Sequence, residues 1–195
     1  MFAYITFVLI CVELWIVNAQ TPTNWGSCPD HPTVDQFDLE KFQGPWYEIE
    51  RSFYVFELLG NCPKFNFSIT SGDSMEVKFS MKNRITGNKN VIDGLAYPKP
   101  YNPAIWDYRV NSGLPKYLSR IMPGSGKYFI LDTDYDSYAI MYSCSNLGLF
   151  HSDLIWVLGR DKNLEPESRT LIYTHLNNLH IDEARLTLSK QLNCP

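Results

Sequence analysis

Eight segments of alternating apolar and polar residues, separated by turn-forming residues, constrain the fold of this 195-residue chain more than any other feature. Successive side chains of a strand point to opposite sides, so a period of two is typical of strands that are buried on one face. No helical pattern interrupts the series, which predicts an antiparallel barrel or a sandwich of two sheets. The segments lie near residues 46–52, 64–70, 75–83, 90–97, 105–110, 127–133, 138–144 and 154–160.

Helical periodicity appears only after the last of these segments. In 165–176, Pro166 stands at an early helical position, acidic residues occupy the first turn, and Leu171, Ile172 and Leu176 recur at helical spacing. A short final strand is expected at 185–192. Before the first strand we expect an irregular arm at 21–38, rich in Pro, Asp and Thr, and one turn of helix at 37–42.

Three separated motifs resemble the signature of the lipocalin family. They are Gly44-Pro45-Trp46 at the start of the first strand, Thr133-Asp134-Tyr135 between the sixth and seventh strands, and a lone Arg160 that ends the eighth. The resemblance covers almost the whole mature chain. Its finer details resemble the apolipoprotein D-like members of that family, including insect ones: Trp46 to Glu50, Tyr142-Ser143-Cys144, Phe150-His151-x-Asp153 and Asn193-Cys194-Pro195.

The resemblance implies an all-β fold, an eight-stranded antiparallel up-and-down barrel with one C-terminal α-helix packed outside and a short final strand. A barrel of eight strands has room for one small ligand. The resemblance also implies that the Arg160 guanidinium lies over the Trp46 indole and closes the bottom of the barrel, a contact of about 0.5–2 kcal/mol. Asp134 is expected to accept hydrogen bonds from backbone amides of its turn.

Candidate cavity residues follow from the alternation of side chains. Trp156 shares the parity of Leu154, Leu158 and Arg160. If Arg160 points toward the barrel axis, Trp156 is predicted to do so too, and the resemblance implies a cavity position for this tryptophan. There it lines either a cavity or a filled core, and we favour the cavity wall. Ile155 and Val157 then face outward, under the helix near Leu171. The full set of predicted ligand-binding residues is Trp156, Phe67, Phe79, Val110 and Tyr128.

Residues 1–19 read as a secretory signal, which leaves 20–195 as one domain. The stretch has an apolar core and ends in Val17-Asn18-Ala19, a small-residue cleavage site, although it lacks an early Lys or Arg and contains Glu13. The alternative is an uncleaved anchor, but the apolar run is short for a membrane span. We therefore expect a secreted, extracellular protein.

Cleavage at Ala19 removes Cys11 and leaves an even number of cysteines, which predicts two disulfides in an oxidising compartment. Four cysteines allow three pairings, and the sequence alone does not choose among them. The resemblance implies Cys28–Cys144 and Cys62–Cys194. In the chain-entropy model, loops this long give roughly 4–5 kcal/mol of stabilisation per disulfide.

Asn66-Phe67-Ser68 is a sequon for N-glycosylation, which requires an exposed asparagine. If Asn66 faces outward, alternation turns its neighbours inward. The predicted core or cavity wall on this strand is then Phe65, Phe67 and Ile69.

Several classes of function are disfavoured. The net charge is −4 and no basic run is present, which argues against a nucleic-acid partner. No Cys or His pair has ligand spacing, so we expect no metal and no cofactor. His151 and Asp153 could suggest acid–base chemistry, but no nucleophile accompanies them, and we interpret them as a solvent-facing loop pair. We therefore expect no catalytic residues and no enzymatic activity.

The function predicted is that of a carrier that binds a small hydrophobic ligand, such as a sterol, fatty acid, retinoid or tetrapyrrole. Tyr128 or Glu48 could orient it. The alternative is an enzyme or a protector against lipid peroxides that acts through an exposed Met122.

The loop 111–126 is either a tolerated insertion or a lid at the rim. The apolar run 147–150 either packs under the rim or contacts a lipid particle or membrane surface. The sequence does not indicate the oligomeric state.

Overall fold

The computed structural model describes residues 23–52, 60–70, 74–111, 113, 125–146, 148–191 and 194. The predicted signal peptide, Met122 and most of the 111–126 loop lie outside these residues and stay predictions. No helix in the described part of the chain is long and apolar enough to cross a membrane.

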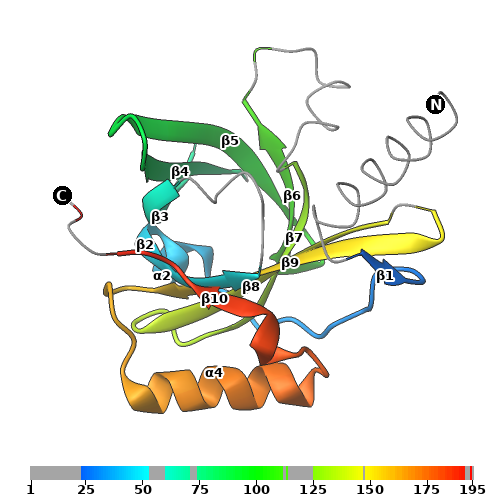
Figure 1. Cartoon of the computed structure of the whole chain (residues 1–195). Coiled ribbons are helices and arrows are strands. Elements are labelled where there is room, and N and C mark those ends of the chain that lie inside the picture. Colours follow the sequence, from blue (N-terminus) through cyan, green and yellow to red (C-terminus); the bar gives the residue numbers. More distant parts are fainter. Residues whose placement is uncertain are drawn as a thin grey trace, which may run out of the picture.

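Eight consecutive antiparallel strands form the predicted barrel (Figure 1). Each strand pairs with the next along the chain, and β9 returns to pair with β2, so that the sheet closes on itself. The strands are β2 (Gly44–Ser52), β3 (Gly60–Ile69), β4 (Met75–Asn83), β5 (Lys89–Lys99), β6 (Asn102–Val110), β7 (Gly126–Thr133), β8 (Tyr138–Asn146) and β9 (Phe150–Gly159).

Alternation along these strands creates two apolar clusters. The first fills the inside of the barrel and contains Trp46, Phe67 and Trp156. The second lies outside, between the sheet and helix α4 (Pro166–Asn178). Ile155 and Val157 belong to this outer cluster, as alternation predicted. The helix covers them with Ile172 and Leu176, whereas Leu171 is exposed.

Helix α4 is also held to the barrel by polar contacts. The Tyr173 hydroxyl donates a hydrogen bond of 2.8 Å to the buried carboxylate of Glu50, which also pairs with Arg169. Pro166 is the first residue of the helix. Amide groups in the first turn form no hydrogen bond within the helix, so a proline costs none there. Figure 1 shows α4 lying outside the barrel.

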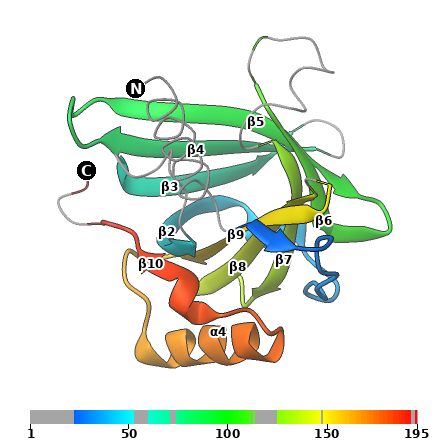
Figure 2. The same cartoon turned by 45° about the vertical axis from the view of Figure 1, so that its right-hand side comes forward.

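Both ends of the chain add a short strand to the barrel (Figure 2). Strand β1 (Thr23–Trp25) pairs with β9, although the arm was predicted to be irregular. Strand β10 (Leu186–Leu188), which follows the 3₁₀ turn η2 (Glu183–Arg185), pairs with β2 and is shorter than predicted. The two disulfides join Cys28 to Cys144 and Cys62 to Cys194, the pairing that the resemblance implied.

Two local predictions were wrong. Strand β5 does not stop before Pro98, because Pro98 lies next to a register shift against β6, where a residue without an amide proton is tolerated. Ile69 is not core but 41% exposed. It is the last residue of β3, and the neighbouring β2 reaches only to the position opposite Phe67, so no residue of β2 pairs with Ile69.

Candidate ligand-binding site

Arg160 closes one end of the barrel. Its guanidinium lies 3.8 Å from the centroid of the Trp46 ring, and Trp46 itself is fully buried. The same group donates four hydrogen bonds to backbone carbonyl oxygens, to Tyr135 and Gln43 at 2.8 Å, to Lys41 at 2.8 Å and to Pro45 at 3.1 Å. One side chain at this closed end therefore holds two stretches of chain, 41–45 and the turn at Tyr135, to the end of β9.

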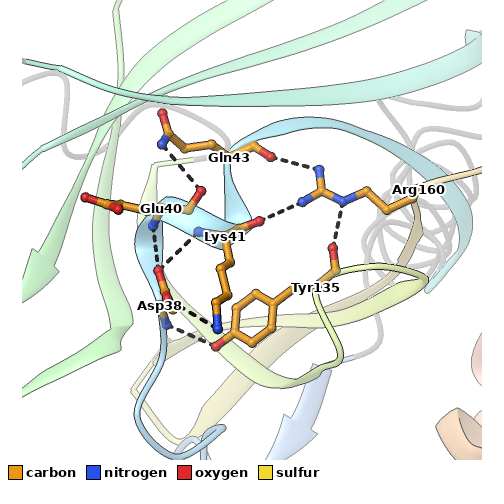
Figure 3. A network of polar contacts seen from close by, with 6 residues as sticks. All are labelled: Asp38, Glu40, Lys41, Gln43, Tyr135 and Arg160. Carbon is orange, nitrogen blue, oxygen red and sulfur yellow. Dashed lines mark hydrogen bonds and ion pairs between the residues drawn. The ribbon is translucent and has the colours of Figure 1, made fainter.

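A second set of contacts supports the same end (Figure 3). Asp38 caps the short helix α2 (Leu39–Phe42) by accepting hydrogen bonds from the Glu40 and Lys41 amides. The Asp38 amide donates to the Tyr135 hydroxyl at 3.0 Å. Gly44 has a φ of +93° and a Cβ there would lie 3.4 Å from Arg160, so the first strand begins with a residue that permits this approach.

The turn that carries Tyr135 is shaped by Asp134. One carboxylate oxygen accepts from the amides of Asp136, Ser137 and Tyr138 at 2.8–3.2 Å. Burial acts to raise the pKa of Asp134, but these hydrogen bonds prevail and lower it. Asp134 therefore has the backbone-binding role that the sequence predicted, and the closed end is a structural device.

The inward-facing side chains change from fully buried to partly exposed along the barrel axis. On β9, Leu158 is 0% exposed, Trp156 is 5% exposed and Leu154 is only partly buried. The same order holds on other strands for Met75, Phe79 and Met81 of β4, for Ala104, Trp106 and Tyr108 of β6, and for Ile130 and Tyr128 of β7. Inward-facing side chains are thus closely packed at the end near Arg160 and are partly exposed at the opposite end, which we call the open end.

Aromatic rings line the inner wall of the barrel at the open end. Tyr128 stacks on Trp156 with ring centroids 5.6 Å apart, and Tyr108 meets Tyr128 edge-on at 5.5 Å. Burial raises the pKa of the Tyr108 hydroxyl, and the nearby Asp93 adds to this, so the hydroxyl remains a neutral donor. The open end therefore offers apolar ring faces with a polar group among them, as small-molecule sites commonly do.

The five predicted ligand-binding residues lie at different depths. Trp156, Tyr128 and Phe79 face the inside of the barrel at or near the open end. Val110 is half-buried at the end of β6, on the face that alternation gives to Tyr108. Phe67 lies deeper, 5.0 Å from Phe42 and 5.7 Å from Trp106 between ring centroids, and it belongs to the packed floor.

The prediction omitted Tyr108, Leu154 and Met81. A signal for each was present, because Tyr108 shares the parity of Val110, Leu154 that of Trp156, and Met81 that of Phe79. Asn66 lies on the outer face of β3 and is half-buried, with Phe65 and Phe67 inside, so the predicted parity is correct. Its glycosylation stays a prediction.

The Glu48 carboxylate, which could have oriented a ligand, is instead bound by other residues of the protein. Its carboxylate is fully buried, lies 3.2 Å from Arg51 Nε and accepts a hydrogen bond from Ser189. Burial raises the pKa of Glu48 to about 7, against the opposing effects of Arg51 and Ser189. Among the described residues, none forms a hydrogen bond with its other oxygen. Glu48 therefore connects β2 to the C-terminal segment.

The interpretation of His151 and Asp153 as a solvent-facing loop pair was wrong, since both side chains are buried. Strand β9 begins at Phe150, so alternation turns both residues to the outer face of the sheet, beneath the N-terminal arm and η2. Asp153 forms an ion pair of 2.6 Å with Arg185, and His151 Nδ1 lies 3.1 Å from the Gly26 carbonyl oxygen. These contacts fasten the two chain ends.

Two further predictions concern partners. Within the described ranges, no group of three His, Cys, Asp or Glu side chains could hold a metal ion.

In the apolar run 147–150, Leu149 is exposed, and the ring centroids of Phe150 and Trp25 lie 4.4 Å apart. Residue 147 is outside the described residues. Contact of this run with a lipid particle or membrane surface stays a prediction.

Comparison with known proteins gives consistent matches. Residues 43–191 match the model of the lipocalin / cytosolic fatty-acid binding protein family. Apolipoprotein D of Cavia porcellus is 38% identical over 174 residues, which are 88% of this chain and 86% of that protein. The bilin-binding protein of Pieris brassicae is 28% identical, covering 77% and 76%. Insecticyanin from the tobacco hornworm Manduca sexta has the same fold, with a TM-score of 0.73, 24% identity, and 89% and 90% coverage.

Proposed function

The chain belongs to the lipocalin / cytosolic fatty-acid binding protein family, and we propose that it binds one small hydrophobic molecule in the open end of its barrel. A sterol, a fatty acid, a retinoid and a tetrapyrrole are the candidate classes. The description of the family names fatty acids, and a relative is named for binding a bilin, which supports a binding role rather than catalysis.

One observation carries this proposal. Inward-facing side chains of a closed barrel are shielded from solvent on the outside by the sheet itself. Leu154, Tyr128 and Tyr108 nevertheless keep accessible surface, whereas the residues below them on the same strands keep almost none. An apolar molecule that covers these rings would gain about 25 cal/mol for each Å² of apolar surface removed from water, before the costs of ordering.

The disulfides support an extracellular location. Two cross-links that close loops of more than a hundred residues are typical of proteins in an oxidising environment. Together with the predicted signal at 1–19, they support a secreted protein. The alternative role in protection against lipid peroxides depends on Met122, which lies outside the described residues, and it stays a prediction.

Ligand binding is expected to change the emission of Trp156, because a ligand at the open end would contact its indole or the stacked Tyr128. Trp156→Ala should remove most of that signal and weaken binding by about 1–3 kcal/mol, a loss of roughly 5- to 150-fold in affinity. The measurement is a titration of parent and variant with retinol, cholesterol, oleate and biliverdin, followed by tryptophan fluorescence.

Trp25→Ala is the matched control, since Trp25 is 77% exposed on β1, outside the barrel. It should lower total emission without changing any affinity. Far-ultraviolet circular dichroism of each variant verifies that the barrel is intact. If Trp156→Ala binds all four compounds as tightly as the parent does, the ligand is not held against this wall.

A further inference from the structure

Strand β5 is paired along only part of one of its edges. It pairs with β4 over 89–96, but with β6 only over 94–99. A hydrogen bond of 2.8 Å from the Asn111 amide to the Asp93 carbonyl oxygen continues the contact with β6 by one residue. Among the residues that the structure describes, none pairs with 89–92 on the β6 side. We call this stretch the free edge of β5.

The backbone groups that point out of the free edge belong to alternate residues. The Asn83 amide of β4 donates to the Asn88 carbonyl oxygen at 2.8 Å, so even-numbered residues here direct their amide and carbonyl groups toward β4. Odd-numbered residues direct theirs the other way, as the bond from Asp93 to β6 shows. The amide and carbonyl groups of Lys89 and Val91 therefore point out of the free edge, where no described strand pairs with them.

The hairpin of β4 and β5 also exposes large apolar side chains. Val91, Ile92 and Leu95 of β5 are exposed, and so is Ile85 in the turn that joins the two strands. Figure 2 shows this turn reaching beyond the neighbouring β3. Grouped apolar side chains on a surface commonly mark a contact with another molecule, and an unpaired strand edge is a template for a further strand.

The charges of the free edge match a second copy of the same edge. Because Ala96 faces the barrel interior, alternation places Lys89, Val91 and Asp93 together on the outer face. If two copies pair antiparallel with Val91 opposite Val91, then Lys89 of each copy lies opposite Asp93 of the other, where opposite charges stabilise the pair. One Asp93 oxygen accepts from the Asn111 side chain at 2.9 Å, and a carboxylate has acceptor sites for a further donor.

We propose that the protein associates with a second copy of itself through the free edge of β5, so that the two sheets continue across a two-fold axis at Val91. Each Val91 amide donates to the Val91 carbonyl oxygen of the other copy, and two ion pairs between Lys89 and Asp93 flank this centre. The contact is short, so the dimer is expected to be reversible, with a dissociation constant on the order of 10–100 μM.

Sedimentation velocity between about 1 and 300 μM protein tests the dimer, and the parent should pass from monomer to dimer over this range. Val91→Pro should stay monomeric, because it lacks the amide at the centre of the pairing. The substitution removes no bond to β4, since this amide points away from β4, and proline is tolerated at such edge positions. Val91→Thr is the matched control. It keeps the amide and a β-branched side chain, and its dissociation constant should stay within about threefold of the parent's.

Charge reversal tests the register of the two strands. Lys89→Glu places a carboxylate opposite Asp93 at both ends of the contact and should weaken association by about tenfold. Lys89→Glu combined with Asp93→Lys restores opposite charges across the axis and should recover most of that loss. Lys127→Glu changes the net charge by the same amount at an exposed lysine of β7 and should associate like the parent. Far-ultraviolet circular dichroism verifies that each variant is folded.

A parent that is still monomeric at about 300 μM would overturn the proposal, whatever other molecule the hairpin contacts. Val91→Pro that dimerises as strongly as the parent would overturn it too, because the interface would then lie elsewhere. Lys89→Glu that associates as tightly as the parent, or a folded charge-reversed double variant that associates no better than Lys89→Glu, would show that the two edges do not meet in this register.

Discussion

Replacement of Arg160 by alanine is expected to lower the free energy of unfolding by about 3 kcal/mol. The variant loses the contact of the guanidinium with the Trp46 ring at 3.8 Å and four hydrogen bonds to the carbonyl oxygens of Tyr135, Gln43, Pro45 and Lys41. Arg160 is half-buried, so each bond contributes less than it would in the interior. Their number, rather than any single contact, makes the effect large.

Urea unfolding of parent and variant measures this difference. Arg160→Lys is the matched control, since it keeps a cation near the indole but cannot form the same four bonds with one planar group, and it should recover about half of the loss. Ligand affinity of the folded variants should equal that of the parent, because Arg160 is at the closed end. A large loss of affinity at unchanged stability would show that Arg160 contacts the ligand.

Glu48→Gln is expected to make the stability of the protein less sensitive to a rise in pH from mildly acidic to neutral conditions. Burial raises the pKa of Glu48 from about 4.3 in the unfolded chain to about 7 in the fold. Below about pH 4.3 the carboxyl is protonated in both states, so its contribution is constant. Between about pH 4.3 and pH 7 the carboxyl is ionised in the unfolded state but still protonated in the fold, so the parent loses about 3 kcal/mol of stability over this interval and no more above it, where both states are ionised.

The variant lacks this ionisation, so its stability relative to the parent should increase by about 3 kcal/mol between pH 4.5 and pH 8.5. Urea unfolding across this range measures the difference, which removes the contributions of all other titrating groups. Glu40→Gln, at an exposed carboxylate on α2, should show no such trend. If parent and Glu48→Gln have parallel pH profiles, then Glu48 is not a buried acid that ionises near neutrality.

The barrel could be predicted because period-two alternation is a local property, and a closed sheet satisfies all eight segments at once. The same rule located Trp156 and Tyr128 on the inner face. The rule failed for short segments whose contacts join residues far apart in the sequence. Strand β1 has only three residues, and its pairing with β9 joins positions more than a hundred residues apart, so no local pattern marks it.

The misplacement of His151 and Asp153 has a similar origin. Their burial depends on the N-terminal arm and on Arg185, which lies 32 residues after Asp153, and neither is visible in the local alternation. The contact between β2 and the C-terminal segment is a further case. Glu48 and Ser189 are 141 residues apart, and only the fold brings the acid, Arg51 and the C-terminal segment together. Sequence patterns therefore predicted the strands of the barrel but not the contacts that the N- and C-terminal segments make with them.

Native mass spectrometry of the protein isolated from its own source under non-denaturing conditions tests the central claim most directly. We expect a mass that exceeds that of the polypeptide and any glycan it carries by one small apolar molecule, which denaturation releases into an organic extract for identification. Trp156→Ala produced in the same way should carry less of it. A parent protein that has only the mass of its polypeptide and glycan, and that takes up no hydrophobic compound on incubation, would contradict the account.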